Sequence, residues 1–299
     1  MRRVLNRPRV VALGYLLILP AFLVILFVMI IPLATGSAFS LFDFKFGSGQ
    51  GLGRFLFLKN FVRFFADATA LKALQVTLLF SAGALAGELF LGILIAVLLD
   101  KISVRLAGIL RAIFCVPLLV SPIIVGLIWR YMYDPTFGLV YAFFSRIGLR
   151  SFFGGLSSPA WALLCVIIAD IWETTPFILL VITSGLAVIP EELYEAARID
   201  GAGSTRIFFS IMLPMLVKVI SVVLVIRGGD AFRVFDIIYA LTGGGPANST
   251  LSLSILAFKE GFVKYQMGYA MAISLITMIL VVGLFGSFSR VSVRQERTR

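Results

Sequence analysis

Histidine is absent from this sequence of 299 residues, and cysteine occurs only twice. Histidine is the commonest general base near neutral pH and the commonest metal ligand in proteins. Cys115 and Cys165 lie in separate apolar runs, far from any CxxC spacing, which favours two small buried residues over a metal or redox pair. These absences disfavour a membrane enzyme that uses acid–base or metal chemistry, and we expect no catalytic residue and no metal site in the chain.

Charged residues are also scarce in this chain. They make up 14% of it, whereas hydrophobic residues make up 60%, and the mean hydropathy is +1.06. A soluble globular domain contains about 25% charged residues and about 45–50% apolar residues. The chain is therefore too apolar to be solvated on all sides, which predicts an integral membrane protein.

The few charges are mostly basic, with 26 Lys and Arg against 15 Asp and Glu and a net charge of +11. Basic clusters lie near both ends, in Arg2, Arg3, Arg7 and Arg9 and in Arg290, Arg294, Arg297 and Arg299. Aromatic residues do not alternate with these arginines as they would in a nucleic-acid groove. Basic residues that flank apolar helices instead indicate the cytoplasmic side of a membrane, and we expect no nucleic-acid partner.

Six apolar segments are long enough to cross a bilayer, whose hydrocarbon core of about 30 Å requires about 20 helical residues. They are predicted at about 10–33, 73–99, 106–129, 160–188, 207–226 and 268–288. The first is too long for a signal peptide and lacks a small-residue cleavage site, so we interpret it as a retained helix. An even number of spans places the tails 1–9 and 290–299 on one side, and their arginines predict that this side is cytoplasmic. The expected fold is an all-α integral membrane protein with one transmembrane domain over 10–289.

A short polar helix is predicted at about 190–200, between the fourth and fifth spans. Pro190 suits the first helical position, Glu191 and Glu192 complement the helix dipole, and Gly201 provides a stop. At 1.5 Å per residue this helix is only about 16 Å long, too short to cross a bilayer, and the topology places it on the cytoplasmic face. It is either a solvated connector or a docking surface.

The stretch "EAARIDGAGSTRIFFSIMLP" resembles the EAA signature of ABC importer permeases. The residues in register are Glu195, Ala196, Ala197, Gly201, Ile211, Leu213 and Pro214. The stretches "IWETTPFILLVITSGLAVIPEELYEAARIDGAG" and "RVFDIIYALTGGGPANST" are similar to the carbohydrate-uptake branch of that family, the maltose- and trehalose-type permeases, and the resemblance extends over about 10–290.

This resemblance implies a type I ABC importer permease fold in a bacterial inner membrane, with 190–200 as the coupling helix. The residues expected to contact the ATPase are Tyr194, Glu195, Ala196, Ala197, Asp200 and Gly201. The implied partners are a second homologous permease subunit, two ATP-binding subunits, an external solute-binding protein, a carbohydrate substrate and membrane lipid. The chain lacks a G-x-x-x-x-G-K-[ST] loop, so we expect ATP and Mg²⁺ to bind to the ATP-binding subunits and this chain to hold no cofactor.

Polar residues inside the spans are candidates for the substrate path, because such residues are costly in a bilayer. Glu88 lies beside Gly83, Gly87 and Gly92, which favours a packing role over substrate contact. In "DIWETTPF", the ring of Trp172 with Glu173 and Thr174 suits a sugar, although a cap with an interfacial tryptophan explains the same residues.

The segment 226–239 offers Phe232, Arg233, Asp236 and Tyr239. They could belong to a cavity lining, to a surface that docks the external receptor, or to an ion-paired extension outside the membrane. At helical spacing, Arg227 with Asp230 and Arg233 with Asp236 are predicted to form i,i+3 pairs. The adjacent glycines 228 and 229 are expected to kink the fifth span.

Two other transporter classes remain open at this point. A secondary transporter driven by an ion gradient would contain inverted repeats and a relay of carboxylates, and neither is evident in the sequence. Permeases for glycerol-phosphate or polyol-type solutes share the features of the carbohydrate branch, so the sequence does not identify the solute.

Overall fold

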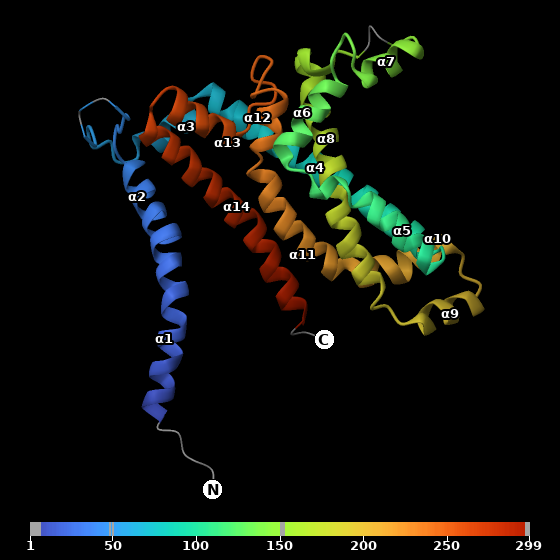
Figure 1. Cartoon of the computed structure of the whole chain (residues 1–299). Helices are drawn as coiled ribbons and strands as arrows, with labels where there is room; N and C mark the ends of the chain where they lie inside the picture. The colour runs from blue at the N-terminus through green and yellow to red at the C-terminus, as the bar shows by residue number, and fades with distance from the viewer. Residues whose placement is uncertain (1–6, 48, 50, 150–152, 297–299) are drawn as a thin grey trace. The chain divides into compact units, whose positions relative to one another are not determined.

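The computed structural model describes residues 7–47, 49, 51–149 and 153–296, and these form helices joined by loops (Figure 1). Within these residues there is no β-strand, only an isolated antiparallel bridge between Phe42 and Phe55. The chain divides into two compact units. The first comprises the part before residue 65 with Ala257–Leu275, and the second comprises Phe65–Leu256 with the part from Ile276 onward. The all-α prediction is confirmed.

The first unit contains a long apolar helix and a small polar cluster. Its elements are α1 (Arg7–Ile25), a π-helical turn η1 (Leu26–Ile30), α2 (Ile31–Phe39), α3 (Lys59–Ala66), a second π-helical turn η5 (Lys259–Val263) and the start of α14 (Met267–Glu296). The side-chain amide of Asn60 donates hydrogen bonds to the carbonyl oxygens of Ser40 (2.8 Å) and Phe42 (3.1 Å), which fixes α3 against the turn after α2. The guanidinium of Arg63 lies 3.8 Å from the ring centroid of Tyr269.

The second unit contains the remaining helices. They are α4 (Ala68–Asp100), α5 (Val104–Phe114), a 3₁₀ turn η2 (Pro117–Leu119), α6 (Pro122–Met132), α7 (Leu139–Arg146), a 3₁₀ turn η3 (Gly155–Ser157), α8 (Pro159–Leu186), α9 (Glu191–Ile199), α10 (Ser204–Ile207), a π-helical turn η4 (Phe208–Met212), α11 (Leu213–Phe232), α12 (Asp236–Leu241), α13 (Leu253–Phe258) and the rest of α14. The packing of α4, α8 and α11 organises this unit.

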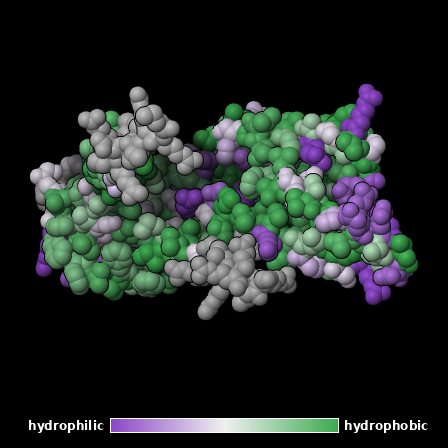
Figure 2. Space-filling model, turned by 90° about the horizontal axis from the view of Figure 1, so that it is seen from below, coloured by the Kyte–Doolittle hydropathy of each residue, from purple (hydrophilic) through white to green (hydrophobic). Residues whose placement is uncertain are grey.

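Five helices are long and apolar enough to cross a membrane within the part of the chain that the structure describes. They are Tyr15–Phe39, Ala68–Asp100, Pro159–Leu186, Ser204–Phe232 and Met267–Gly286. Each overlaps one of the predicted spans, and Ala68–Asp100 and Ser204–Phe232 extend past both of the predicted ends. Figure 2 shows apolar residues over much of one face, with hydrophilic residues gathered on the side where α9 lies.

The predicted span 106–129 is wrong as a single helix. The chain instead forms α5, the turn η2 and α6, with a non-helical break at Val120 and Ser121. Pro117 and Pro122 each begin a new helical segment. Proline lacks a backbone donor and disfavours the α region for the residue before it. Ser121, before Pro122, is accordingly extended with ψ = 140°, whereas Val116, before Pro117, keeps α-helical dihedral angles. The chain therefore breaks before Pro122.

Glycines permit close packing between α4 and α8, as their spacing in the sequence suggested. A Cβ added at Gly92 would lie 2.6 Å from Cγ2 of Ile178, and one at Gly83 would lie 3.0 Å from Cδ1 of Ile167. At the other end of α8, a Cβ at Gly185 would lie 2.8 Å from Cδ2 of Leu216 in α11. Small residues at these positions let three helices approach closely, which supplies dispersion contacts where the hydrophobic effect is weak.

Helix α11 continues through glycines 228 and 229 to Phe232, so the chain keeps its helical hydrogen bonding there and the kink stays a prediction. Both glycines are buried, and a Cβ at Gly228 would overlap the ring of Phe285 in α14. The absence of a side chain at this position therefore serves helix packing.

Candidate functional site

A polar pocket of about 400 Å³ lies beside the C-terminal end of α11 and beside α8. It is lined by Leu118, Pro122, Asp170, Glu173, Thr174, Phe177, Ile226, Arg227, Asp230, Arg233, Val234, Phe235, Asp236 and Ile237. Helix α8 contributes the carboxylates of Asp170 and Glu173. The other charged lining residues come from the end of α11, the turn after it and the start of α12. The break at Arg233–Phe235 turns the chain, so both segments face the same space.

Arg227 joins three helices at the inner side of this polar pocket. Its Nε and Nη2 atoms donate to Oε2 and Oε1 of Glu88 in α4, at 2.9 and 2.8 Å. Nη2 also donates to Oδ2 of Asp170 in α8 and, at 3.4 Å, to the hydroxyl of Thr174. The side chain of Glu88 is fully buried, and those of Arg227 and Asp170 are nearly so. A bidentate guanidinium with two carboxylates satisfies polar groups that would otherwise be very unfavourable in this environment.

The predicted pairing of Arg227 with Asp230 is therefore wrong. Both residues lie on α11 at helical spacing, but Arg227 is buried towards α4 and α8 whereas Asp230 is exposed. Fully buried Glu88 provides the stronger electrostatic partner, because two charges interact more strongly where water is excluded.

The predicted pairing of Arg233 with Asp236 is also wrong. Helix α11 ends at Phe232, and α12 begins only at Asp236, so these two residues do not share a helix. Arg233 instead donates from Nη2 to Oδ1 of Asp230 (2.9 Å) and from Nε to the carbonyl oxygen of Gly229 (3.0 Å). This ion pair lies at the exposed rim of the polar pocket.

Glu173 and Asp236 line the polar pocket without an ion-pair partner among the described residues. Glu173 retains only 7% of its accessible surface, whereas Asp236 is exposed. The pocket therefore contains two carboxylates that are available to a ligand.

The remaining predicted path residues occupy different places. Trp172 is half exposed outside the lining of the polar pocket, and its ring centroid lies 6.0 Å from that of Trp129 at an interplanar angle of 72°. Phe232 is buried and does not line the pocket. Tyr239 is exposed and stacks on Phe235, with ring centroids 5.3 Å apart. The structure thus brings Glu173, Thr174, Arg233 and Asp236 into one pocket and places Glu88 behind it as the partner of Arg227.

The helix α9 is the element expected to dock on an ATPase. It is one residue shorter at its start than predicted, because Pro190 has ψ = 136° and is the N-cap residue. It ends in a Schellman motif: the N–H of Gly201 donates to the carbonyl oxygen of Arg198, and that of Ala202 donates to Ala197. Gly201 has φ = +75°, which glycine adopts without strain, so the predicted stop is confirmed.

The surface of α9 is largely uncovered by the rest of the chain. Glu195, Ala196, Asp200 and Gly201 are exposed, and no residue of the helix is buried. Apolar side chains share this exposure, with Leu193 at 42% and Ile199 at 86%. An exposed helix that combines small residues, a carboxylate and apolar side chains is suited to contact another protein.

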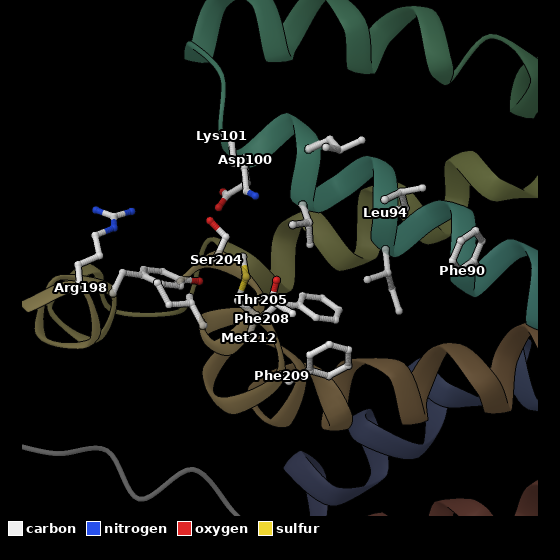
Figure 3. Close-up of a pocket in the computed structure, with 15 residues that line it drawn as sticks. Phe90, Leu94, Asp100, Lys101, Arg198, Ser204, Thr205, Phe208, Phe209 and Met212 are labelled. Atoms are coloured by element: carbon white, nitrogen blue, oxygen red, sulfur yellow. The ribbon is translucent and has the colours of Figure 1, made fainter. Parts of the chain in front are cut away.

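A second cavity, of about 790 Å³, lies beside α9. Its lining residues are Phe90, Ile93, Leu94, Val97, Leu98, Asp100, Lys101, Tyr194, Arg198, Ser204, Thr205, Ile207, Phe208, Phe209 and Met212. Figure 3 shows Asp100 and Lys101 above Ser204 near one end, and Phe90, Leu94 and Phe209 farther along the cavity. Burial and the nearby carboxylate of Asp100 raise the pKa of Tyr194.

Sequence reasoning missed Arg227 and Asp170 as members of one cluster. The available signal was one guanidinium in the fifth apolar span and one carboxylate in each of two others, at Glu88 and Asp170. Because an ionisable residue in a membrane segment seeks a partner, pairing between spans is more informative there than pairing at helical spacing.

The known proteins that this chain resembles are membrane components of transport systems, and the similarity covers most of the chain. A family model described as "Binding-protein-dependent transport system inner membrane component" matches residues 88–295. The trehalose/maltose transport system permease protein MalF of Thermococcus litoralis is 39% identical over 288 residues, which cover 96% of this chain and 94% of that protein. The sn-glycerol-3-phosphate transport system permease protein UgpA of Agrobacterium fabrum is 34% identical over 231 residues, which cover 77% and 78%. A chain in the crystal structure of a bacterial ABC transporter that imports the acidic polysaccharide alginate has a TM-score of 0.80 at 25% identity, over 94% of this chain and 95% of that one.

Proposed function

The chain belongs to the family of binding-protein-dependent transport system inner membrane components, and from this premise we propose that it translocates a sugar or oligosaccharide as one membrane subunit of an ATP-driven ABC importer. It would pair with a second homologous permease subunit and receive its solute from an external solute-binding protein. Two ATP-binding subunits would bind ATP and Mg²⁺, and this chain would perform no covalent chemistry. Family membership favours this function over a secondary transporter driven by an ion gradient.

The observation that carries the proposal is the uncovered helix α9 between two apolar spans. It follows α8 after only a few residues and leads through α10 and η4 into α11. Five described helices are long and apolar enough to span, so this topology counts the broken segment α5–η2–α6 as the sixth crossing. With six crossings both termini would be cytoplasmic, and α9 would lie at the cytoplasmic surface, where an ATPase subunit can bind it. Closure of the ATPase pair would displace α9, and α8 and α11 would carry this displacement to the polar pocket.

The polar pocket supports the proposed substrate class. Its carboxylates accept hydrogen bonds from hydroxyl groups, and Phe177 and Phe235 provide aromatic surfaces for the C–H faces of a sugar ring. The relative that transports trehalose and maltose favours a saccharide, whereas the relative that transports sn-glycerol 3-phosphate keeps a phosphorylated polyol as the second candidate.

The test is reconstitution of the importer with its neighbouring subunits in vesicles, where saccharide uptake and ATP hydrolysis are measured together. Glu195→Gln removes a carboxylate from α9, and Glu192→Gln is the matched control because it is equally a surface glutamate of the same helix. Loss of a charge-assisted hydrogen bond of about 1.5–3 kcal/mol predicts roughly a 10- to 140-fold loss of coupled uptake for Glu195→Gln. The control is expected to retain uptake.

Normal coupled uptake by Glu195→Gln would contradict the assigned role of α9. Failure of the ATP-binding subunits to co-purify with the chain would contradict the proposal as a whole. Reporter fusions that place α9 outside the cell would do the same.

A further inference from the structure

The charges of the polar pocket bear on which solutes can enter it. Four of its lining residues carry carboxylates and two carry guanidiniums, so negative groups are in excess. We propose that the polar pocket admits uncharged saccharides and excludes anionic ones, and that Glu173 and Asp236 produce this selection. This inference rests on the proposed function, because it identifies the substrate class of the same pocket.

Both guanidiniums of the pocket are already neutralised within the chain. Arg227 binds two buried carboxylates, Glu88 and Asp170. Arg233 binds Asp230 at 2.9 Å. A phosphate, sulfonate or carboxylate on a solute would therefore have to displace an existing carboxylate to obtain a cationic partner here.

The two carboxylates without ion-pair partners give the pocket its ligand-binding character. Glu173 is more than nine-tenths buried and lines the pocket, and its carboxylate makes no hydrogen bond or ion pair with the described residues. Carboxylate oxygens accept hydrogen bonds, so Glu173 and Asp236 suit the hydroxyl donors of a sugar. Asp236 is exposed, and its negative charge repels an anion. Burial without a partner is unfavourable for a polar group, and a ligand hydroxyl would supply what the chain does not.

Thiol chemistry measures this electrostatic selection without the solute-binding protein. Ile226→Cys introduces a thiol into the lining of the pocket, in a chain in which Cys115→Ala and Cys165→Ala remove the native thiols. Two thiosulfonate reagents of similar size, one cationic and one anionic, are then reacted with the complete importer. Their rates are normalised to the rates with a free thiol in solution.

We expect the cationic reagent to react about tenfold faster than the anionic one, because two unpaired carboxylates set the local potential. Glu173→Gln with Asp236→Asn should bring the ratio close to unity. Asp43→Asn is the matched control, since it removes a carboxylate that lies outside the pocket and pairs with Lys45. Asp236→Asn alone changes an exposed residue and provides a variant that does not depend on the buried Glu173.

Uptake of an uncharged oligosaccharide by the same importer tests the transport function separately from the exclusion of anions. If the reagents react equally, or if the anionic reagent reacts faster, the selection is overturned while uptake still supports the transport function. If the importer takes up no saccharide with ATP, the proposed function fails and the selection fails with it. A cationic preference that disappears in the double variant, together with saccharide uptake, supports both.

Discussion

Arg227, Glu88 and Asp170 form a buried ion cluster between α11, α4 and α8. Replacement of Arg227 by glutamine tests the structural role of this cluster. Arg227→Gln keeps a polar, though shorter, side chain and removes the positive charge between Glu88 and Asp170. The two carboxylates would then face each other across α4 and α8 without a counter-ion. Either both remain charged in a poorly solvated site, or one must take up a proton.

The expected loss is large because the cluster is buried. Removal of one partner of a buried ion pair costs about 3–5 kcal/mol, because the remaining charge is left uncompensated. One kcal/mol lowers the melting temperature by about 2–4 °C in a protein of 150–250 residues, so the expected decrease is about 6–20 °C. The side chains involved are at most 9% exposed, so solvent screening reduces this cost little.

The assay is thermal unfolding of the purified chain in a mild detergent, followed by circular dichroism of its helices. Arg233→Gln is the matched control, because it breaks an ion pair whose side chains are 62% and 56% exposed. Exposed pairs contribute about 0–1 kcal/mol, so this variant should unfold within a few degrees of the parent protein. The variant Glu88→Gln with Arg227→Gln should recover part of the loss, since it removes one of the two uncompensated carboxylates.

Equal melting temperatures for Arg227→Gln and Arg233→Gln would refute the reasoning. That result would mean that the cluster is solvated or that its carboxylates are already neutral. A double variant less stable than Arg227→Gln would show that Glu88 stabilises the unit through contacts other than the guanidinium.

Three further predictions concern backbone geometry, packing and ionisation. Gly201→Ala places a side chain at φ = +75° and should lower the free energy of unfolding by about 1 kcal/mol. A loss of coupled uptake in vesicles larger than this loss of stability explains would report displacement of α9. Gly228→Ala should lower stability by about 1–3 kcal/mol because its Cβ overlaps a ring in α14, whereas Gly108→Ala on α5 meets open space and should not destabilise the chain in the same melting experiment. The pKa of Tyr194 is raised, so its contribution to stability is complete below the unfolded pKa of about 10 and is lost as the pH rises through the folded pKa. Asp100→Asn removes a nearby negative charge and should shift the absorbance titration of this tyrosine to lower pH. Tyr194→Phe identifies which part of the tyrosinate signal belongs to Tyr194.

Apolar length predicted most of the long helices, because about 20 apolar residues are both necessary for a membrane helix and easy to recognise. The segment 106–129 shows where this criterion fails. Its mean hydropathy does not report that Pro117 and Pro122 each begin a separate helical segment. Apolar composition predicts that a segment lies in the membrane but not that it is one continuous helix. Pro176 lies inside the unbroken helix α8, whereas the segment 106–129 breaks before Pro122.

Rules that relate neighbouring residues predicted the end of α9 correctly and predicted the ion pairs of the polar pocket wrongly. The difference lies in how far apart in the sequence the interacting residues are. The cap at Gly201 is determined by neighbouring residues and a positive φ, so the sequence contains the information. The partners of Arg227 come from residues 57 and 139 positions away, which no spacing rule within one helix can reveal. In a low-dielectric environment the deepest carboxylate is favoured over the nearest one in sequence.

The same two helices bear both candidate surfaces, which determines where motion is expected. Helix α8 precedes α9 and carries Asp170, while α11 follows it through α10 and carries Arg227. Separation of α8 from α11 at the ion cluster would leave buried charges uncompensated at about 3–5 kcal/mol, whereas opening of the exposed pair between Arg233 and Asp230 costs at most about 1 kcal/mol. A displacement of α9 should therefore move α8 and α11 together at Arg227 and change the polar pocket at its rim, where the chain breaks before α12. Asp236 lies at this rim and is not part of the ion cluster of Arg227, Glu88 and Asp170. Access to the pocket can therefore change while the ion pairs of Arg227 stay intact.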